Sequence, residues 1–395
     1  MPDVDTRVRR LLERVEHRDL ETLFRKSVKQ SNWQMHERWI QQKTPELEIA
    51  GALSIMNRHI LANITSLDRF DIANLIDKGT FGTVFKAWDN KWQHYIALKV
   101  VRRVPVYVQD AEYEVAVLDK LATFDRSGRF CVKLYKYFHY HGHLCIVTEI
   151  LGNSLYHALK KMRHEGRAPR MSVIWQVARQ LCEALAFLRT IRLIHTDLKT
   201  ENILLGSEAM TLDDASVSIK LIDFGGATWE MDHHSELIQT RHYRAPEVIL
   251  GLSWNFPCDM WSVGCILLEL YEGQLTFNTH DTLQHLAMIQ RVAGRIPCHM
   301  VRRIPLGNSV AEMFDGGQKL NWPMMAQSQA QRESVMRVWP LSDRILPEHR
   351  DFRDLVSHML EIDPMLRITP EEALQHPFFY DIRAYHPDNF FCNRI

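Results

Sequence analysis

The sequence predicts an α+β fold in which a small β-rich lobe precedes a larger α-helical lobe. Short β-branched and aromatic runs broken by glycine occupy residues 70–150, and such runs are typical of strands. Apolar residues at helical spacing dominate residues 151–380, which indicates amphipathic helices. We therefore expect two lobes, with the seam between them near residues 149–153.

Composition favours a globular protein over a membrane or nucleic-acid-binding one. The chain has 395 residues, 46% of them apolar, which is enough for a sizeable core. Lysine plus arginine equals aspartate plus glutamate at 48 each, so net charge gives no reason to expect direct binding of nucleic acid or membrane. The N-terminus is polar and no apolar run approaches the roughly 20 residues of a membrane span. The seven cysteines include no C-x-x-C pair, which argues against a zinc site or disulfide framework.

The two ends of the chain lie outside these lobes. Residues 1–65 predict a helical extension, because apolar side chains recur there at helical spacing. They include Val8, Leu11, Leu12, Val15, Leu20 and Leu23. The extension has no low-complexity run and no Arg-Ser repeat, which favours an ordered or conditionally ordered segment. Residues 381–395 are expected to form a C-terminal tail.

Five strands and one helix are expected in the small lobe. The strands cover residues 70–76, 83–88, 95–101, 132–138 and 144–148. A helix over residues 111–121 separates the third strand from the fourth. In the large lobe the clearer helical segments are residues 171–189, 257–270, 281–292, 350–360 and 370–374.

A glycine-rich turn joins the first two strands. Residues 78–84 read K-G-T-F-G-T-V, and the missing side chains would let backbone N–H groups approach phosphate oxygens. Asp77 stands where the usual G-x-G-x-x-G pattern has its first glycine. A plain hairpin turn would explain Gly79 and Gly82 equally well, so the turn alone leaves both interpretations open.

A lone lysine lies in the apolar third strand. Lys99 falls within the run I-A-L-K-V of residues 96–100, and burying an unpaired ammonium is strongly unfavourable. Lys99 therefore either points outward as an ordinary strand charge or meets a phosphate and a carboxylate. Glu114, on the inward face of the following helix, is the predicted carboxylate.

The strongest chemical signal lies in the large lobe. Residues 195–202 read H-T-D-L-K-T-E-N, residues 223–225 read D-F-G and residues 244–247 read R-A-P-E. Taken singly, these residues could be turn, cap or core positions. In this order they resemble the catalytic loop, magnesium loop and A-P-E motif of eukaryotic protein kinases. No packing rule requires that combination.

This resemblance implies a bilobal protein-kinase fold over residues 70–380 that transfers phosphate from ATP, with Mg²⁺, to hydroxyl groups of protein substrates. Phosphoryl transfer requires positioning and charge neutralisation more than covalent help. By resemblance, Asp197 takes or orients the hydroxyl proton and Lys199 steadies the γ-phosphate. Asn202 and Asp223 would hold Mg²⁺.

The same resemblance implies a nucleotide site between the lobes. Lys99, fixed by Glu114, would hold the α- and β-phosphates, and backbone groups of residues 149–151 would bind the adenine edge. The implied nucleotide-binding residues are Ile76, Asp77, Lys78, Gly79, Thr80, Phe81, Gly82, Val84, Ala97, Lys99, Thr148, Glu149, Leu151 and Leu204.

One segment resembles a particular kinase family. Residues 284–294 read Q-H-L-A-M-I-Q-R-V-A-G and agree at six of eleven positions with E-H-L-A-M-M-E-R-I-L-G, the signature of the LAMMER or Clk-type dual-specificity kinases of the CMGC group. The residues around 233–250 and His195-Thr196-Asp197 resemble the same family. The alternative for 284–294 is an amphipathic helix packed on the large lobe. The family implies a monomeric kinase domain, arginine- and serine-rich substrates such as splicing factors, and a nuclear location, with the cytoplasm as the alternative.

Three residues bear on regulation and specificity. Thr196 replaces the arginine that in many kinases pairs with a phosphorylated loop, so we expect activity without strict dependence on loop phosphorylation. Thr148 replaces the phenylalanine usual in this family before the hinge, which predicts a larger pocket behind the adenine; the alternative is that threonine simply suits a strand. Glu201 could pair with a substrate arginine or be an ordinary surface charge. The hydroxyl groups of Ser235, Thr240 and Tyr243 are candidate modification sites.

Structural supports are also implied by the resemblance. Glu247 would pair with Arg367, and Asp259 would brace the catalytic-loop backbone. The apolar stack expected to align the lobes consists of Leu118, Leu134, His195 and Phe224.

Two rival functions share some of these residues. Small-molecule phosphotransferases also use H-x-D-x-x-x-x-N, but R-A-P-E followed by Asp259 favours a protein acceptor. A pseudokinase scaffold would fit Asp77 and the altered 284–294 segment. The presence of Lys99, Glu114 and Asp197 together with Asn202 and Asp223 argues against a pure scaffold.

Overall fold

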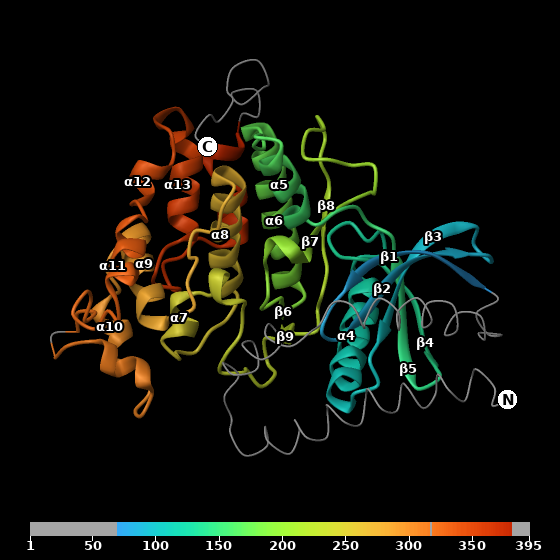
Figure 1. The fold of residues 1–395 in the computed structure, drawn as a ribbon, viewed down its shortest axis with the longest axis horizontal. Coiled ribbons are helices and arrows are strands. Elements are labelled where there is room, and N and C mark those ends of the chain that lie inside the picture. Colours follow the sequence, from blue (N-terminus) through green and yellow to red (C-terminus); the bar gives the residue numbers. More distant parts are fainter. Residues whose placement is uncertain (1–68, 317, 381–395) are drawn as a thin grey trace. The chain divides into compact units, whose positions relative to one another are not determined.

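The computed structural model describes residues 69–316 and 318–380. The predicted helical extension over 1–65 and the tail over 381–395 lie outside the described residues. Within the described part a five-stranded sheet is followed by a mainly helical lobe (Figure 1). The α+β architecture predicted from the sequence is therefore confirmed. No helix in this part of the chain combines the length and the apolar character needed to cross a membrane.

The sheet is antiparallel and has the strand order β1-β2-β3-β5-β4. Its strands are β1 (Phe70–Lys78), β2 (Gly82–Asp89), β3 (His94–Val101), β4 (Leu134–Tyr140) and β5 (His143–Glu149). Lys99 lies opposite Val84 on one side and Ile146 on the other, and Ala97 lies opposite Thr148. Because side chains alternate along a strand, all five residues point to the same face of the sheet.

The starts of the small-lobe helix and of the fourth strand differ from the prediction. Helix α4 spans Pro105–Phe124, six residues longer at its start than expected, because a proline is well tolerated in the first helical turn. The fourth strand begins at Leu134 and not at residue 132. The N–H of Val132 instead donates to the carbonyl of Leu221 at 2.9 Å, which ties this stretch to the large lobe.

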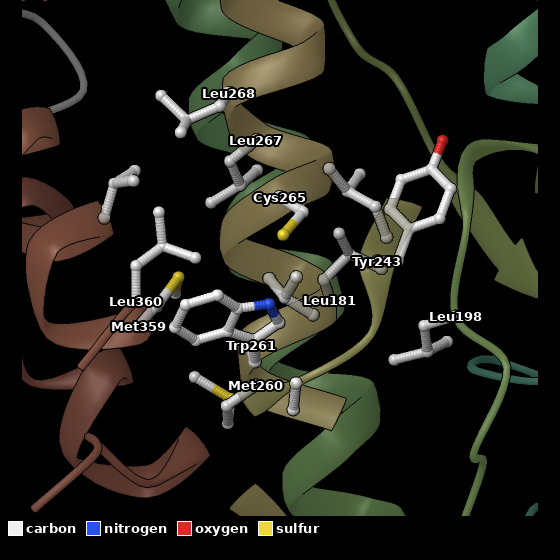
Figure 2. Packing of buried hydrophobic residues seen from close by; sticks show 14 of the residues in the cluster. Leu181, Leu198, Tyr243, Met260, Trp261, Cys265, Leu267, Leu268, Met359 and Leu360 are labelled. Carbon is white, nitrogen blue, oxygen red and sulfur yellow. The ribbon is translucent and has the colours of Figure 1, made fainter. Parts of the chain in front are cut away.

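The large lobe is built around long buried helices. Its helices are α5 (Leu155–His164), α6 (Met171–Thr190), α7 (Pro246–Ile249), α8 (Pro257–Glu272), α9 (Thr282–Ala293), α10 (Cys298–Val301), α11 (Gln329–Met336), α12 (Leu341–Arg344), α13 (Arg350–Met359) and α14 (Pro370–Leu374). Helix α5 was not among the predicted segments. Figure 2 shows Trp261 and Cys265 of α8 within the apolar core beside Met359 and Leu360. A Cβ at Gly264 would lie 2.8 Å from Leu360 Cδ2, so glycine permits this close helix contact.

Two short ladders connect this core to the predicted motifs. Strand β6 (Leu193–Ile194) pairs with β9 (Thr228–Trp229), and β7 (Ile203–Leu205) pairs with β8 (Ile219–Leu221). The H-T-D-L-K-T-E-N segment therefore runs from β6 to β7, and the D-F-G segment follows β8. The ladders bring the two motifs side by side.

Candidate active site

Asp259 of α8 fixes the backbone at the start of the segment 195–202, the predicted catalytic loop. Its carboxylate accepts from the N–H of His195 at 2.8 Å and from the N–H of Thr196 at 3.0 Å. Thr196 has φ +66°, a left-handed conformation that is uncommon for a β-branched residue. Its hydroxyl donates to the Gly226 carbonyl at 2.6 Å. The predicted brace is present, and it holds the loop in a conformation that the local sequence does not favour.

Asp197 is surrounded by donors on both carboxylate oxygens. Lys199 Nζ lies 2.6 Å from Oδ2, while Oδ1 accepts from Thr240 N–H at 2.9 Å and from the Thr240 hydroxyl at 2.7 Å. Burial acts to raise the pKa of Asp197, but the Lys199 ammonium and the Thr240 hydroxyl outweigh it and hold this pKa below its usual range. Asp197 is therefore an ionised acceptor at neutral pH.

Asn202 and Asp223 present oxygen atoms suited to a hard cation. The side-chain N–H₂ of Asn202 donates to the Asp197 carbonyl at 2.9 Å, which leaves the amide oxygen as an acceptor. Among the described residues no donor is hydrogen-bonded to the carboxylate of Asp223, which has φ +63°. Carboxylate and amide oxygens are the ligands that Mg²⁺ prefers, so the donor set fits the predicted metal.

Lys99 points inward and is paired. Its Nζ lies 2.6 Å from Glu114 Oε2 of helix α4. Burial disfavours the ammonium, but the carboxylates of Glu114 and Asp223 outweigh this and raise the pKa of Lys99. Of the two alternatives that the sequence left open, the structure shows the ion pair.

The residues of the predicted apolar stack belong to the same packed region. The rings of His195 and Phe224 have centroids 4.9 Å apart, and Phe224 is fully buried. Leu118 of α4 is in the same buried cluster, and Leu134 packs against it. The lobes are therefore aligned with the D-F-G phenylalanine inside the core.

The glycine turn is shaped by one close backbone approach. A Cβ at Gly82 would lie 2.4 Å from the carbonyl oxygen of Val100 on β3, whereas a Cβ at Gly79 would meet nothing within 4 Å. The Gly79 N–H donates to the Gly82 carbonyl at 3.0 Å, and Lys78 N–H donates to the Asp77 carboxylate at 2.7 Å. The close packing of β2 against β3 thus explains Gly82, and the open space at Gly79 is compatible with its predicted phosphate role.

The predicted adenine-facing residues line the sheet face and the floor beneath it. Val84, Ala97 and Leu204 are half-buried, while Ile76 and Phe81 are each 50% exposed. Thr80 is half-buried and lies between the two glycines of the turn. The exposed apolar side chains beside the glycine turn are available to cover a flat aromatic base.

The hinge residues have distinct roles. The carboxylate of Glu149 is bound to Lys220 Nζ at 2.6 and 2.7 Å and to Lys133 N–H at 2.8 Å. Its carbonyl accepts from the Thr148 hydroxyl at 3.2 Å. Within residues 69–316 and 318–380 neither backbone group of Leu151 has a hydrogen-bond partner. Leu151 can therefore both donate to and accept from an adenine edge.

Comparison with known proteins identifies the family. The protein kinase domain family matches residues 70–379. Serine/threonine-protein kinase AFC1 of Arabidopsis thaliana is 42% identical over 341 residues, which cover 80% of this chain and 72% of AFC1. Human dual specificity protein kinase CLK1 is 41% identical over 328 residues, covering 79% of this chain and 66% of CLK1. The chain is a LAMMER (Clk-type) protein kinase. A crystal structure of a kinase domain is 36% identical, with a TM-score of 0.74, and covers 79% of this chain and 95% of its own.

Membership of this family makes the protein a serine/threonine kinase that uses ATP, and it gives the remaining contacts a context. The kinase contains functional contacts that its motifs did not reveal. The hydroxyl of Tyr113 on α4 donates to the Ala227 carbonyl at 2.8 Å, and Lys120 Nζ lies 4.0 Å from the ring centroid of Trp229. Both contacts join α4 to the segment after D-F-G.

The three candidate modification sites differ in accessibility. Ser235 is exposed. Thr240 is half-buried and its hydroxyl is bound to Asp197. Tyr243, labelled in Figure 2 beside α8, is 2% exposed and donates to Glu269 Oε2 at 2.6 Å. In this conformation of the kinase only Ser235 is open to a modifying enzyme, because the other two hydroxyls serve as internal hydrogen-bond groups.

Proposed function

We propose that this kinase transfers the γ-phosphate of Mg²⁺-bound ATP to serine or threonine residues of arginine-rich protein segments, such as those of Arg/Ser-rich splicing factors. The observation that carries the proposal is the Asp197 carboxylate, ionised by its neighbours and adjoining two oxygen ligands for a cation. An acceptor hydroxyl that donates to this carboxylate would be oriented for attack.

The residues of the chain act mainly by holding charge in place. Asp197 accepts the hydroxyl proton as the new oxygen–phosphorus bond forms, while the bond between the γ-phosphorus and the β-phosphate oxygen breaks and ADP leaves. The Lys199 ammonium balances charge on the transferred group. Lys99 is held by Glu114 and so is placed to meet the α- and β-phosphates. Asn202 and Asp223 would hold Mg²⁺, which neutralises phosphate charge when bound. Each role requires a fixed position more than a new covalent bond.

One carboxylate supports the preference for arginine. Glu201 is exposed within the segment 195–202 and forms no ion pair with any of the described residues. A guanidinium group supplies the positive charge and the forked donors that pair with a carboxylate. Glu269 lies nearby, but it is buried and accepts hydrogen bonds from Tyr243 and Thr200, so it offers no contact to a substrate.

The test is transfer of labelled phosphate from ATP with Mg²⁺ to an Arg-Ser peptide, to an acidic peptide and to the kinase itself. The wild type is expected to label the Arg-Ser peptide, and Asp197→Asn should lower the rate by at least about 10³-fold, since the base is lost. Glu201→Gln should raise the peptide KM and leave the KM for ATP unchanged. If ATP binds but nothing is labelled, the scaffold alternative is supported; equal labelling of the acidic peptide would refute the arginine preference.

A further inference from the structure

Gln239, the residue before Thr240, adopts an unusual backbone conformation. Its φ is +64°, in the left-handed region that residues with a Cβ rarely occupy, and only 7% of its surface is exposed. Such a conformation persists only where the surroundings enforce it. The contacts of Gln239 therefore show which groups stabilise this backbone conformation.

The side-chain amide of Gln239 is fully hydrogen-bonded. Its Nε2 donates to the Cys258 carbonyl and to Ser262 Oγ, both at 2.8 Å, and its Oε1 accepts from the Ala245 N–H at 2.9 Å. Ser262 in turn donates to the Tyr243 carbonyl at 2.8 Å. One neutral side chain thus ties the segment before the R-A-P-E motif, and Ala245 within the motif, to the first turns of helix α8.

The backbone of Gln239 is held from the other side. Its carbonyl accepts from Arg244 Nη2 at 2.8 Å and from Nε at 3.2 Å, and Nε also donates to the Ile238 carbonyl at 2.9 Å. These bonds fix the peptide plane between residues 239 and 240. The N–H of that plane belongs to Thr240, and it is the group that donates to Asp197 Oδ1.

We propose that Gln239 is a positioning residue for phosphoryl transfer: its buried amide fixes the peptide so that the N–H and hydroxyl of Thr240 meet the Asp197 carboxylate. The inference rests on the proposed role of Asp197. The partners of the side-chain amide are uncharged, and the guanidinium of Arg244 holds the Gln239 carbonyl. None of these contacts involves a phosphate. Nothing in the residue type signals the role, because it depends on contacts with α8.

The test compares Gln239→Ala and Gln239→Gly with a matched control. Glycine adopts φ +64° without strain, so the pair separates loss of the amide from loss of the conformation. Gln176→Ala is the control: Gln176 on α6 also makes three side-chain hydrogen bonds, to the carbonyls of Ser172 and Ala215 and from the N–H of Val217.

We expect both Gln239 variants to lower kcat about tenfold or more, with the KM for ATP changed less than about threefold. The control should keep the wild-type kcat with a similar loss of melting temperature.

A double-substitution cycle shows whether Gln239 acts through Thr240. Thr240→Val removes the hydroxyl, and in that background Gln239→Ala should lower kcat by a smaller factor than in the wild type. Equal factors in the two backgrounds would overturn the inference, as would a wild-type kcat for Gln239→Gly. Asp197→Asn distinguishes the two levels: if it stays active, the proposed base fails, whereas an inactive Asp197→Asn with fully active Gln239 variants rejects only the positioning role.

Discussion

Glu269 is a buried carboxylate whose protonation should affect stability near neutral pH. Burial and the charge of Glu201 raise its pKa from 4.5 to about 7, against the hydrogen bonds from Tyr243 and Thr200. The folded state therefore binds more protons than the unfolded state between these values, so this group makes stability fall as pH rises through that window. The displacement corresponds to about 3 kcal/mol at most.

Glu269→Gln removes this titration. From pH 5 to pH 8 the melting temperature of the wild type should fall relative to that of the variant, as measured by thermal unfolding at several pH values. Parallel curves for the two proteins would contradict the prediction. Glu312→Gln, at an exposed position, serves as the control and should leave the pH dependence unchanged.

Thr148 is expected to set the depth of the nucleotide pocket. It lies opposite Ala97, on the sheet face predicted to meet the adenine, and a phenylalanine there would fill the space expected behind the base. Thr148→Phe is expected to weaken binding of a purine inhibitor with a bulky aromatic substituent by about tenfold or more, while the KM for ATP changes little. Equal affinity of the inhibitor for both proteins would show that the space is closed by other side chains.

Thr196 stands where many kinases have the arginine that pairs with a phosphorylated loop residue. Its hydroxyl is bound to the Gly226 carbonyl, and the neighbouring Asp197 is held by Thr240. The kinase treated with a broad phosphatase should therefore keep most of its peptide-kinase activity, with mass spectrometry confirming removal of phosphate. Complete loss of activity that returns on rephosphorylation would contradict this expectation.

At the scale of elements, helix α4 is attached at two points outside the Lys99–Glu114 pair. The Tyr113 hydroxyl binds the Ala227 carbonyl, and Lys120 lies over Trp229. A hydrogen bond of this kind contributes about 1 kcal/mol. Its loss is enough to change several-fold the population in which α4 is docked on the segment after D-F-G. Tyr113→Phe should lower kcat/KM by about two- to fivefold and speed hydrogen exchange in α4. Tyr95→Phe, which removes a hydroxyl from β3, is the matched control.

The sequence predicted the elements better than the contacts between them. Runs of β-branched and aromatic residues located all five strands, and helical spacing located α6, α8, α9, α13 and α14. The first six residues of α4, which begins at a proline, were not predicted, and neither was α5. Gln239, Thr240 and Tyr113 are ordinary residue types whose roles depend on partners up to 114 positions away. Local periodicity carries no information about such distant contacts.

At the scale of the whole molecule, the large lobe is held by a fully buried ion pair. Arg367 donates to both oxygens of Glu247 at 2.7 and 2.8 Å, and neither side chain is exposed. Removing one partner leaves an uncompensated buried charge. Arg367→Met should therefore lower the free energy of unfolding by about 3–5 kcal/mol.

The surface pair between Arg189 and Glu371 provides the control. Its side chains are 40% and 50% exposed, so Arg189→Met should change stability by less than about 1 kcal/mol. Denaturant unfolding of the two variants measures both values. Similar losses in the free energy of unfolding for the two variants would contradict the prediction.

The monomeric state, the nuclear location and the helical extension of the kinase remain predictions.

The buried Phe224 ring has a consequence for ligands. Phe224 is fully buried and Lys99 is paired with Glu114, so a nucleotide that binds this arrangement requires neither group to move, and its apparent dissociation constant should lie close to the intrinsic one. Compounds that bind only when Phe224 lies outside the core require this ring to move into solvent first. Exposing that ring costs on the order of 2 kcal/mol, a penalty of about thirtyfold in affinity. This conformation of the kinase therefore favours ligands that leave Phe224 buried over compounds that require the ring to move out.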